Sequence, residues 1–194
     1  DLLGSRGLGD VYKRQIWENQ PKTKYTDIFD HPTSFAGQGR HQKLDILKKF
    51  LDQNEIDHYF VSGLDNIAWL LNLRADDIKY TPLLYSYLLI SKNNKHSLYI
   101  KESSMPEILK KEIQTLININ NIENIGSIFN YINSSESIGL DFNSTTFYFL
   151  DLLRKQKINT KNLANPCILL KAIKNETELD GAKKAHIRLS LIHI

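Results

Sequence analysis

Between Arg40 and Leu163 the chain alternates segments of helical and strand character, and this alternation most constrains its fold. Apolar residues at helical spacing predict helices over 40–54 and 105–116, and a short apolar run predicts a largely buried helix over 64–71. Residues of high β-propensity predict strands over 57–62, 137–142 and 158–163, and a hairpin of two strands over 85–91 and 96–100. Strands alternating with helices, with one hairpin, predict an α/β fold with a mixed sheet.

Local patterns add finer predictions at the ends of these elements. Ser104 with Glu107 has the pattern of a capping box, which would open a helix with Met105, Ile108, Leu109, Ile113 and Leu116 on one face. A short strand is predicted near 122–125. Asn143-Ser144 would cap a helix with Phe147, Leu150 and Leu153 on one face. Asn165-Pro166 marks a boundary, and Asn175 with Glu178 opens a last helix.

Both ends of the chain fall outside this alternation, since neither 1–15 nor 189–194 has the hydrophobic period of a helix or strand. Asp10–Gln15 and Leu189–Ile194 can be encoded by the two strands of one transposon-end adapter used in sequencing libraries. We therefore interpret residues 1–15 and 189–194 as translated sequencing adapter and exclude them from fold reasoning. In the remaining insert, 16–188, the segment 16–36 has no period and is predicted to be an extended connector.

The composition is that of an ordinary soluble protein. Lys and Arg number 25 against 22 Asp and Glu among 194 residues, and the net charge of +3 is too small to indicate a nucleic-acid or acidic-membrane partner. A single cysteine excludes a disulfide framework. Because no apolar run is long enough to cross a bilayer and the N-terminus lacks the features of a signal peptide, we expect a cytoplasmic protein.

The insert carries few candidate catalytic groups. Its histidines are dispersed, and no pair has the spacing that places two metal ligands on one helix face. A solvated loop explains the acidic doublet Asp76-Asp77 better than a metal site does. Cys167 lies among Ile168, Leu169 and Leu170, so we expect a buried, unreactive thiol. No catalytic and no metal-ligating residue is assigned.

One passage, from Ile67 to Tyr87, carries more information. An apolar helix containing Trp69 runs into a single arginine, Arg74, which is followed by an acidic loop with Asp76 and Asp77 and by a strand. Arg74 could simply pair with Asp76 or Asp77, or it could bind a carboxylate or a peptide carbonyl. From the residues alone the structural interpretation is favoured.

This passage resembles the second domain of the three-domain Xaa-Pro aminopeptidases, members of the creatinase and prolidase superfamily. In that family a helix similar to Ile67–Arg74 is followed by Gly-Ser-Asp and Tyr-Asn-Pro, where this chain has Ala75-Asp76-Asp77 and Tyr80-Thr81-Pro82. Ile16–Pro21 is similar to the segment that joins the family's first two domains, where Arg is more usual than Gln20. Asn165–Arg188 resembles the start of the catalytic domain.

The resemblance implies an α/β, creatinase N-terminal-like (ribonuclease H-like) fold, a mixed β-sheet with helices on both faces. It divides the insert into a connector from the first domain (16–36), a second creatinase-like N-terminal domain (37–165) and the start of a truncated pita-bread catalytic domain (166–188). It implies a metallo-aminopeptidase that hydrolyses the bond between an N-terminal residue and a following proline. Two divalent metal ions, usually manganese, would be held beyond Arg188, so the fragment itself would have no cofactor and no activity.

In such an enzyme this region covers the active-site cleft, and Arg74, Asp76 and Asp77 are the candidates for the surface that faces the substrate. The partners expected are peptides with proline at the second position, the chain's own catalytic domain and a second copy in a homodimer, with no nucleic acid and no membrane. One alternative is a non-catalytic peptide- or protein-binding module built on the same domains. Another is a prolidase, although that group usually lacks the three-domain arrangement.

Overall fold

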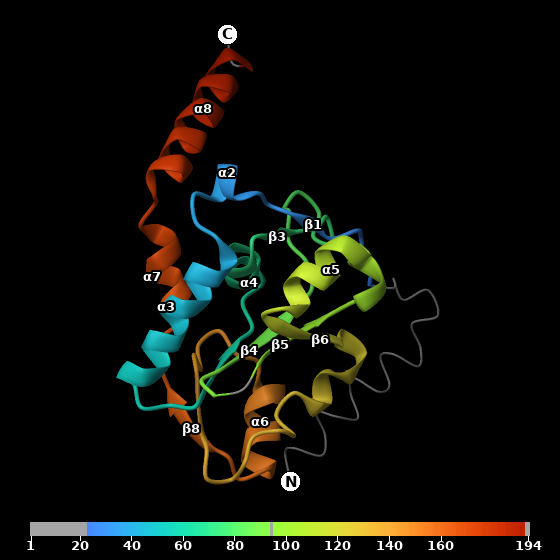
Figure 1. Ribbon diagram of the computed structural model, residues 1–194, viewed down its shortest axis with the longest axis vertical. Helices are drawn as coiled ribbons and strands as arrows, with labels where there is room; N and C mark the ends of the chain where they lie inside the picture. The colour runs from blue at the N-terminus through green and yellow to red at the C-terminus, as the bar shows by residue number, and fades with distance from the viewer. Residues whose placement is uncertain (1–22, 94, 193–194) are drawn as a thin grey trace.

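The computed structural model describes residues 23–93 and 95–192, and its centre is a six-stranded sheet (Figure 1). The strand order is β6-β5-β4-β2-β7-β8. The strands are β2 His58–Val61, β4 Tyr87–Ser91, β5 His96–Ile100, β6 Ile117–Asn121, β7 Ser137–Leu140 and β8 Asn159–Asn162. β4 is antiparallel to both β2 and β5, whereas the pairs β2-β7, β5-β6 and β7-β8 are parallel. The predicted hairpin and the mixed sheet are therefore confirmed.

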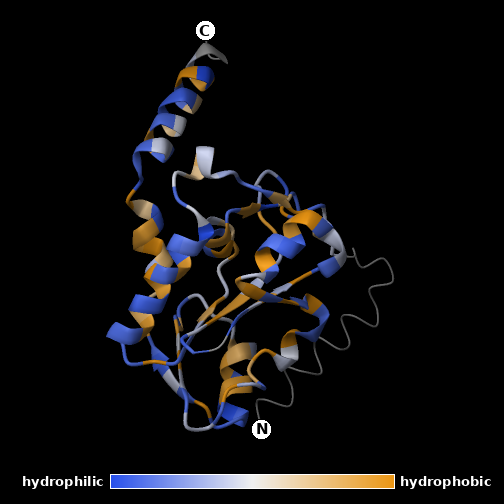
Figure 2. Cartoon of the chain, in the orientation of Figure 1, coloured by the Kyte–Doolittle hydropathy of each residue, from blue (hydrophilic) through white to orange (hydrophobic). Residues whose placement is uncertain are grey.

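Helices cover both faces of this sheet, as the resemblance implied. The α-helices of the domain and its C-terminal extension are α2 Thr33–Ala36, α3 Arg40–Gln53, α4 Leu64–Leu71, α5 Glu107–Gln114, α6 Phe147–Lys155, α7 Pro166–Ala172 and α8 Glu176–Ile192. There are also two 3-10 helices, η1 Glu102–Ser104 and η2 Ile122–Ser127. In Figure 2 the central strands are largely hydrophobic, whereas α8 is mostly hydrophilic.

The core consists of two clusters, one on each face of the sheet. The first contains buried side chains of α3, α4, α5 and α7, among them Leu47, Leu71 and Ile113. The second is aromatic: the ring of Phe60 on β2 lies 4.6 Å from that of Phe149 on α6 and 5.3 Å from that of Phe129, between ring centroids. Aromatic pairs at these separations contribute about 0.5–1.5 kcal/mol each beyond their burial, so α6 is fixed mainly by this cluster.

The predicted extended connector is partly regular structure. Phe29–Asp30 forms the short strand β1, which pairs antiparallel with β3, Leu73–Arg74, and α2 follows directly. Ile28 is 2% exposed and belongs to the first core cluster. A pattern of two residues has no period to detect, which is why the sequence did not indicate this ribbon. Residues 16–22 lie outside the described residues.

The predicted capping box at Ser104 is not formed. Met105 is extended (φ −99°, ψ 122°), as expected for a residue that precedes a proline, and α5 starts at Glu107, after Pro106. Ile108, predicted on the buried face, is 87% exposed, while Leu109 and Ile113 are buried. The helix exists as predicted, but it begins later.

The strand predicted near 122–125 and the predicted start of the helix after Asn143 both differ in position from the structure. The strand expected over 122–125 lies earlier, at β6, and residues 122–127 form η2. Helix α6 buries Phe149 and Leu153, with Thr146 at its N-cap, whereas Phe147 is 64% exposed. Asn143 and Ser144 instead form a turn on Asp141, to whose Oδ1 the amide of Asn143 donates. Helix α6 therefore starts after this turn.

The C-terminal helices follow the predicted boundary at Asn165. The side chain of Asn165 accepts a hydrogen bond from the amide of Cys167, so it is the N-cap of α7, with Pro166 at the first helical position. The predicted capping box of α8 is confirmed in both directions: Glu178 N donates to Asn175 Oδ1 (2.9 Å), and Asn175 N donates to Glu178 Oε2 (3.0 Å). α8 extends away from the sheet (Figure 1) and continues to Ile192, through the predicted adapter boundary at 189.

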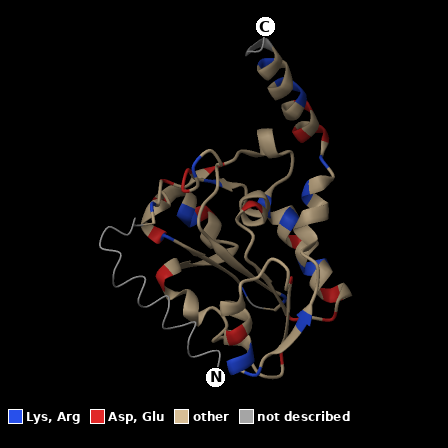
Figure 3. Ribbon diagram, turned by 180° about the vertical axis from the view of Figure 1, so that it is seen from behind, with Lys and Arg blue, Asp and Glu red and all other residues tan. Residues whose placement is uncertain are grey.

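Residues of both charge signs are scattered along the ribbon in Figure 3, and in α8 the acidic residues of the first turns are followed by the basic ones. Within the described residues, no helix combines the length and the apolar character needed to cross a membrane.

Candidate substrate-facing site

Arg74 is positioned by the abrupt end of α4. Asn72 follows that helix in the left-handed conformation (φ 52°), which asparagine tolerates better than most residues. Its side chain donates to Gln38 O (2.9 Å) and accepts from Lys43 Nζ (2.8 Å), so the turn is held on both sides. The chain then enters β3, where Arg74 pairs with Phe29 of β1.

The guanidinium of Arg74 is half-buried and bound to backbone carbonyls. Nη1 donates to Ala68 O (2.6 Å) and Leu73 O (2.9 Å). Burial lowers the pKa of Arg74, but a guanidinium stays charged at physiological pH. Among the described residues Arg74 forms no salt bridge, so the pairing with Asp76 or Asp77 considered from the sequence is not observed. Within the described residues, the hydrogen bonds of its guanidinium are therefore all to backbone carbonyls.

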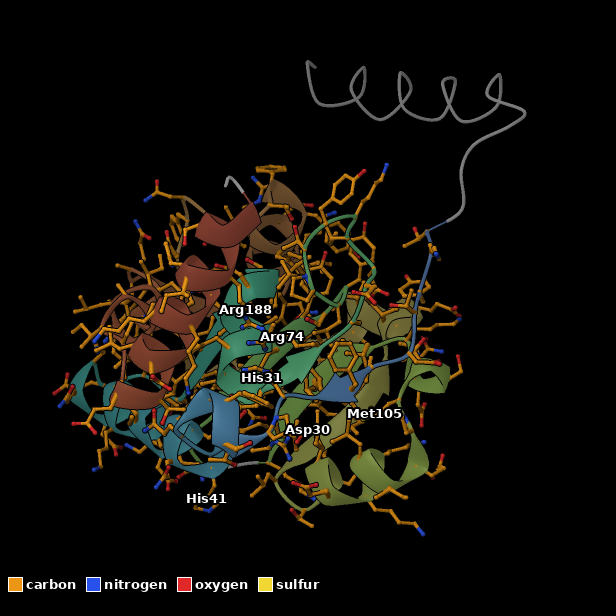
Figure 4. All side chains as sticks on the ribbon, turned by 90° about the horizontal axis from the view of Figure 1, so that it is seen from above. Asp30, His31, His41, Arg74, Met105 and Arg188 are labelled. Carbon is orange, nitrogen blue, oxygen red and sulfur yellow. The ribbon has the colours of Figure 1, made fainter. Side chains whose placement is uncertain are left out.

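His31 lies beside Arg74 and follows β1 (Figure 4). Its backbone amide donates to Asn72 O (2.8 Å), and its ring stacks on Phe35 with 6.0 Å between the centroids. The pKa of His31 is below its ordinary value because the ring is partly buried, and the charges of Arg74 and Lys43 lower it further. At neutral pH the imidazole is therefore uncharged and can both donate and accept a hydrogen bond.

Arg74 and His31 line one wall of a cavity of about 500 Å³, and α8 forms the opposite wall. Figure 4 shows Arg188 of α8 near both residues. α8 also contributes Glu178 and Lys184 to the lining. Arginine and lysine side chains around a small cavity are suited to hold a carboxylate or a carbonyl oxygen.

Asp76 and Asp77 lie next to Arg74 in the sequence but are not among the residues that line this cavity. The Asp77 carboxylate accepts from Thr26 N (2.7 Å), Thr26 Oγ1 (2.9 Å) and Tyr85 N (2.9 Å). The backbone amide of Asp76 donates to the same Thr26 hydroxyl (2.8 Å). These contacts tie the N-terminal segment to the loop, and a role for either carboxylate toward a substrate stays a prediction.

Helix α8 is held in place by contacts between side chains that the sequence did not place together. Trp69 Nε1 donates to Glu178 Oε1 (3.2 Å), and Asn175 Nδ2 donates to Ala36 O (2.9 Å). Lys43, which is 1% exposed, lies under the indole with Nζ 4.2 Å from the ring centroid, and Nζ also donates to Trp69 O (2.8 Å). Burial lowers the pKa of Lys43 to about 8, although the Glu178 charge opposes the shift.

A sequence signal for Lys43 did exist. It stands four and eight residues before Leu47 and Leu51, on the stripe of α3 that faces the core, where a charged residue needs a partner. Glu178 was recognised only as half of a capping box. The sequence did not indicate a role for His31, because His31 lies in the segment 16–36, which has no helical or strand periodicity.

Cys167 is fully buried, as predicted. Burial raises the pKa of its thiol to about 12, which keeps it protonated and unreactive. The part of the chain that the structure describes contains no group of three or more His, Cys, Asp or Glu side chains that could hold a metal ion. The described residues therefore do not fit a di-metal centre.

These features match a known family. A family model described as the creatinase/prolidase N-terminal domain matches residues 19–178. The chain belongs to this family. The resemblance seen in the sequence is thereby confirmed, and the six-stranded sheet with helices on both faces is the fold of a creatinase/prolidase N-terminal domain.

Proteins that share this creatinase/prolidase N-terminal domain include named aminopeptidases. The chain is 33% identical to Xaa-Pro aminopeptidase 1 of Dictyostelium discoideum over 178 residues, which is 88% of this chain and 27% of that protein. It is 30% identical to a probable Xaa-Pro aminopeptidase P of Leptosphaeria maculans, over 94% of this chain and 31% of that protein. The chain thus spans less than a third of the length of these relatives.

The fold also matches a solved structure. An X-prolyl aminopeptidase from Caenorhabditis elegans, described as a cytosolic enzyme with a di-nuclear active site, superposes with a TM-score of 0.80. The match covers 90% of this chain and 29% of that one at 22% identity, and it supports the assignment of the fold.

Proposed function

We propose that this chain is the non-catalytic N-terminal part of a metal-dependent Xaa-Pro aminopeptidase, and that it covers the active-site cleft of that enzyme. The single observation that carries the proposal is the match of 88% and 94% of the chain to proteins named Xaa-Pro aminopeptidase. The parent enzyme would hydrolyse the bond between an N-terminal residue and a following proline. That bond suits a dedicated enzyme, because proline has no N–H and its φ is fixed.

The position of α8 supports a covering role. The helix is tied to the domain at its first turn and extends beyond it, with Leu179 (46%) and Ile187 (61%) exposed. Apolar side chains at this spacing suit a helix that packs on a further domain. We propose that this further domain is the catalytic one, and that it carries two divalent metal ions, usually manganese, which would stabilise the charge that develops on the attacked carbonyl.

Arg74 is the residue of the described region that we assign to the substrate. Its guanidinium is held by two carbonyls at the wall of the cavity beside α8, which leaves its other nitrogens available for a peptide carbonyl or carboxylate. Peptides with proline at the second position are the proposed ligands. A second copy of the parent chain in a homodimer is a further proposed partner, whereas nucleic acids and membranes are not expected, and a cytoplasmic location is proposed.

The test compares the full-length parent enzyme with its Arg74→Ala variant on Xaa-Pro peptides. We expect the KM to rise about tenfold, equivalent to about 1.4 kcal/mol of lost binding, and this effect to exceed the destabilisation of the fold. Arg154→Ala is the matched control, because Arg154 is exposed on α6 and its salt bridge within the described residues is to Asp151. A lower melting temperature with unchanged kinetics would make Arg74 a purely structural residue.

A second experiment tests the enzyme class. The 194-residue chain with added manganese should not hydrolyse Xaa-Pro peptides, whereas the full-length parent should. Turnover by the isolated chain would overturn the assignment of a non-catalytic region. Binding of such peptides by the parent without turnover would instead identify a binding module.

A further inference from the structure

A second cavity, of about 600 Å³, lies on the sheet face opposite α3 and α4 and is separate from the site of Arg74. Strand register explains its composition. His58 on β2 pairs with Ser91 on β4, and Ser97 on β5 pairs with Asn118 on β6. The other half of the same face carries Phe60 and the aromatic cluster. One half of this sheet face is thus apolar and covered by α6. The other half carries polar side chains, and the cavity lies over it.

The floor of this cavity is a buried chain of hydrogen-bonding groups. His58 and Ser91 are each 3% exposed, and His58 Nδ1 lies 2.9 Å from Ser91 Oγ. His58 Nε2 has no hydrogen-bond partner among the described residues, and its nearest carboxylate oxygen, Glu136 Oε2, is 3.5 Å away. The negative charge favours a proton on Nε2, which makes Ser91 the donor to Nδ1. The free lone pairs of the Ser91 hydroxyl are then left to accept.

The walls contain further polar side chains that form no hydrogen bond with the described residues. Within the described residues, the side chains of Ser97, Asn118 and Tyr131 make no hydrogen bond, although all three line the cavity. Each can both donate and accept. Leu89 and Ile132 add apolar wall beside them.

The lining is nearly free of charge. Among the described residues that line it there is no Asp or Glu, and the one lysine among them, Lys95, donates to Gln114 O. A divalent cation would lack acidic ligands, and an anion would lack a free positive partner. Tyr131 stands at the rim with 74% of its surface exposed, and it also lines an adjoining hollow of about 330 Å³.

We propose that this cavity binds a small, uncharged, polyhydroxylated molecule of the mono- or disaccharide class. The hydroxyls of such a ring need neighbouring groups that donate and accept, which Ser91, Ser97 and Asn118 supply. Its C–H faces suit Leu89 and the ring of Tyr131. The volume lies within the range of about 300–1,000 Å³ that is typical of small-molecule sites.

The test is a titration of the full 194-residue chain with glucose, maltose and myo-inositol, followed by NMR. We expect saturable shifts for at least one of them with a Kd of about 1 mM. Tyr131→Ala and Ser97→Ala should each weaken binding at least about fivefold with an unchanged melting temperature. Tyr80→Ala, which removes another highly exposed tyrosine outside the cavity, should leave the affinity unchanged.

Three outcomes would overturn the proposal. They are the absence of saturable binding by all three compounds, binding that Tyr131→Ala leaves unchanged, and saturation by inorganic phosphate or adenosine but by none of the three. Tyr131 is exposed, so its variant should fold even if Ser97→Ala does not.

Discussion

Trp69 and Glu178 are joined by a hydrogen bond of 3.2 Å from the indole Nε1 to Oε1 of the carboxylate. Trp69 belongs to α4, which packs in the core, and Glu178 belongs to the first turn of α8. The other oxygen of Glu178 accepts from the amide of Asn175. One side chain therefore both caps its own helix and attaches that helix to the domain.

Glu178→Ala should loosen the start of α8 without unfolding the domain. It removes a cap worth about 1 kcal/mol and a hydrogen bond of similar value. We expect amide exchange in the first turns of α8 to accelerate by about tenfold or more while the sheet amides keep their protection. Asp180→Ala is the control, since its exposed pair with Lys184 contributes little. Equal exchange in α8 for both variants would contradict the role of Glu178.

Lys43 should make stability depend on pH in the alkaline range. The pKa of Lys43 is about 8 in the folded protein, below the value of 10.5 for a free lysine. Between these values the unfolded lysine binds more protons than the folded one, so the contribution of Lys43 to the free energy of unfolding should rise with pH, by on the order of 3 kcal/mol in total. Above pH 9 the raised pKa of Cys167 acts in the opposite sense, because the unfolded thiol then loses its proton while the folded thiol keeps it. Urea denaturation between pH 7 and pH 9 measures the part of this rise that Cys167 does not oppose.

The control for that measurement is Lys43→Met, which keeps an unbranched chain but cannot titrate. We expect this variant to lack the increase above pH 8. Glu178→Gln is informative as well, because the carboxylate raises the pKa of Lys43, and its loss should move the onset of the rise below pH 8. If the free energy of unfolding depended on pH in the same way in the wild type and in Lys43→Met, Lys43 would not be the group responsible for the rise.

His96 should make the fold sensitive to acid. Burial lowers the pKa of His96 to about 4, with a smaller contribution from the charge of Lys48. Since a free histidine has a pKa of 6.5, the unfolded chain binds more protons between pH 4 and 6.5, and stability falls on acidification through that window. The loss should be on the order of 3 kcal/mol.

His96→Asn tests this, because its Oδ1 can still accept from the Ser91 amide, which donates to His96 Nδ1 at 3.1 Å. Chemical denaturation from pH 4 to 7 should show a flatter profile for His96→Asn. His41→Asn, at an exposed position on α3, should keep the profile of the wild type. If the stability of His96→Asn still fell steeply on acidification, titrating groups other than His96 would be responsible.

Two glycine-to-alanine substitutions should change the free energy of unfolding in opposite directions. A Cβ at Gly139 of β7 would lie 2.7 Å from Ile56 Cδ1 and 2.9 Å from Tyr59 Cδ2, and Tyr59 is held by its hydroxyl bond to Leu163 O. Gly139→Ala should cost about 1–3 kcal/mol. At Gly181 in α8 no described atom lies within 4 Å of the added Cβ, so Gly181→Ala should stabilise that helix by up to about 1 kcal/mol. Urea denaturation and the helical CD signal of both variants decide this.

Local chemistry explains which elements could be predicted. The helix over 64–71 has a glycine before it and an uninterrupted apolar run from Ile67 to Leu71, and the structure gives α4 those same bounds. The Asn175–Glu178 pattern forms its capping box, whereas the similar Ser104–Glu107 pattern does not, because Pro106 lies inside it. In α6 nearly every residue of the first two turns is apolar, so spacing could not decide that Phe149 rather than Phe147 faces the sheet.

The candidate site could be predicted only in part, because most of its residues come from segments that are far apart in the sequence. Arg74 was found because it belongs to one continuous passage of the sequence. His31, Lys43 and Glu178 come from three distant segments. The pairing of β1 with β3 brings His31 near Arg74, and the packing of α3, α4 and α8 brings Lys43 and Glu178 there. Asp77 carries the expected charge, but its carboxylate is occupied by Thr26 and Tyr85.

The attachment of α8 by hydrogen bonds at its first turn also has a mechanical consequence. The stretch from Glu176 to Arg188 is about 20 Å long at about 1.5 Å per residue, and its fixed end lies at Asn175 and Glu178. The helix thus acts as a lever arm: a tilt of about 10° at the Trp69 contact would displace Arg188 by about 3–4 Å. Small repacking around Lys43 would therefore be magnified at the far end, at the distance scale on which a cleft opens or closes.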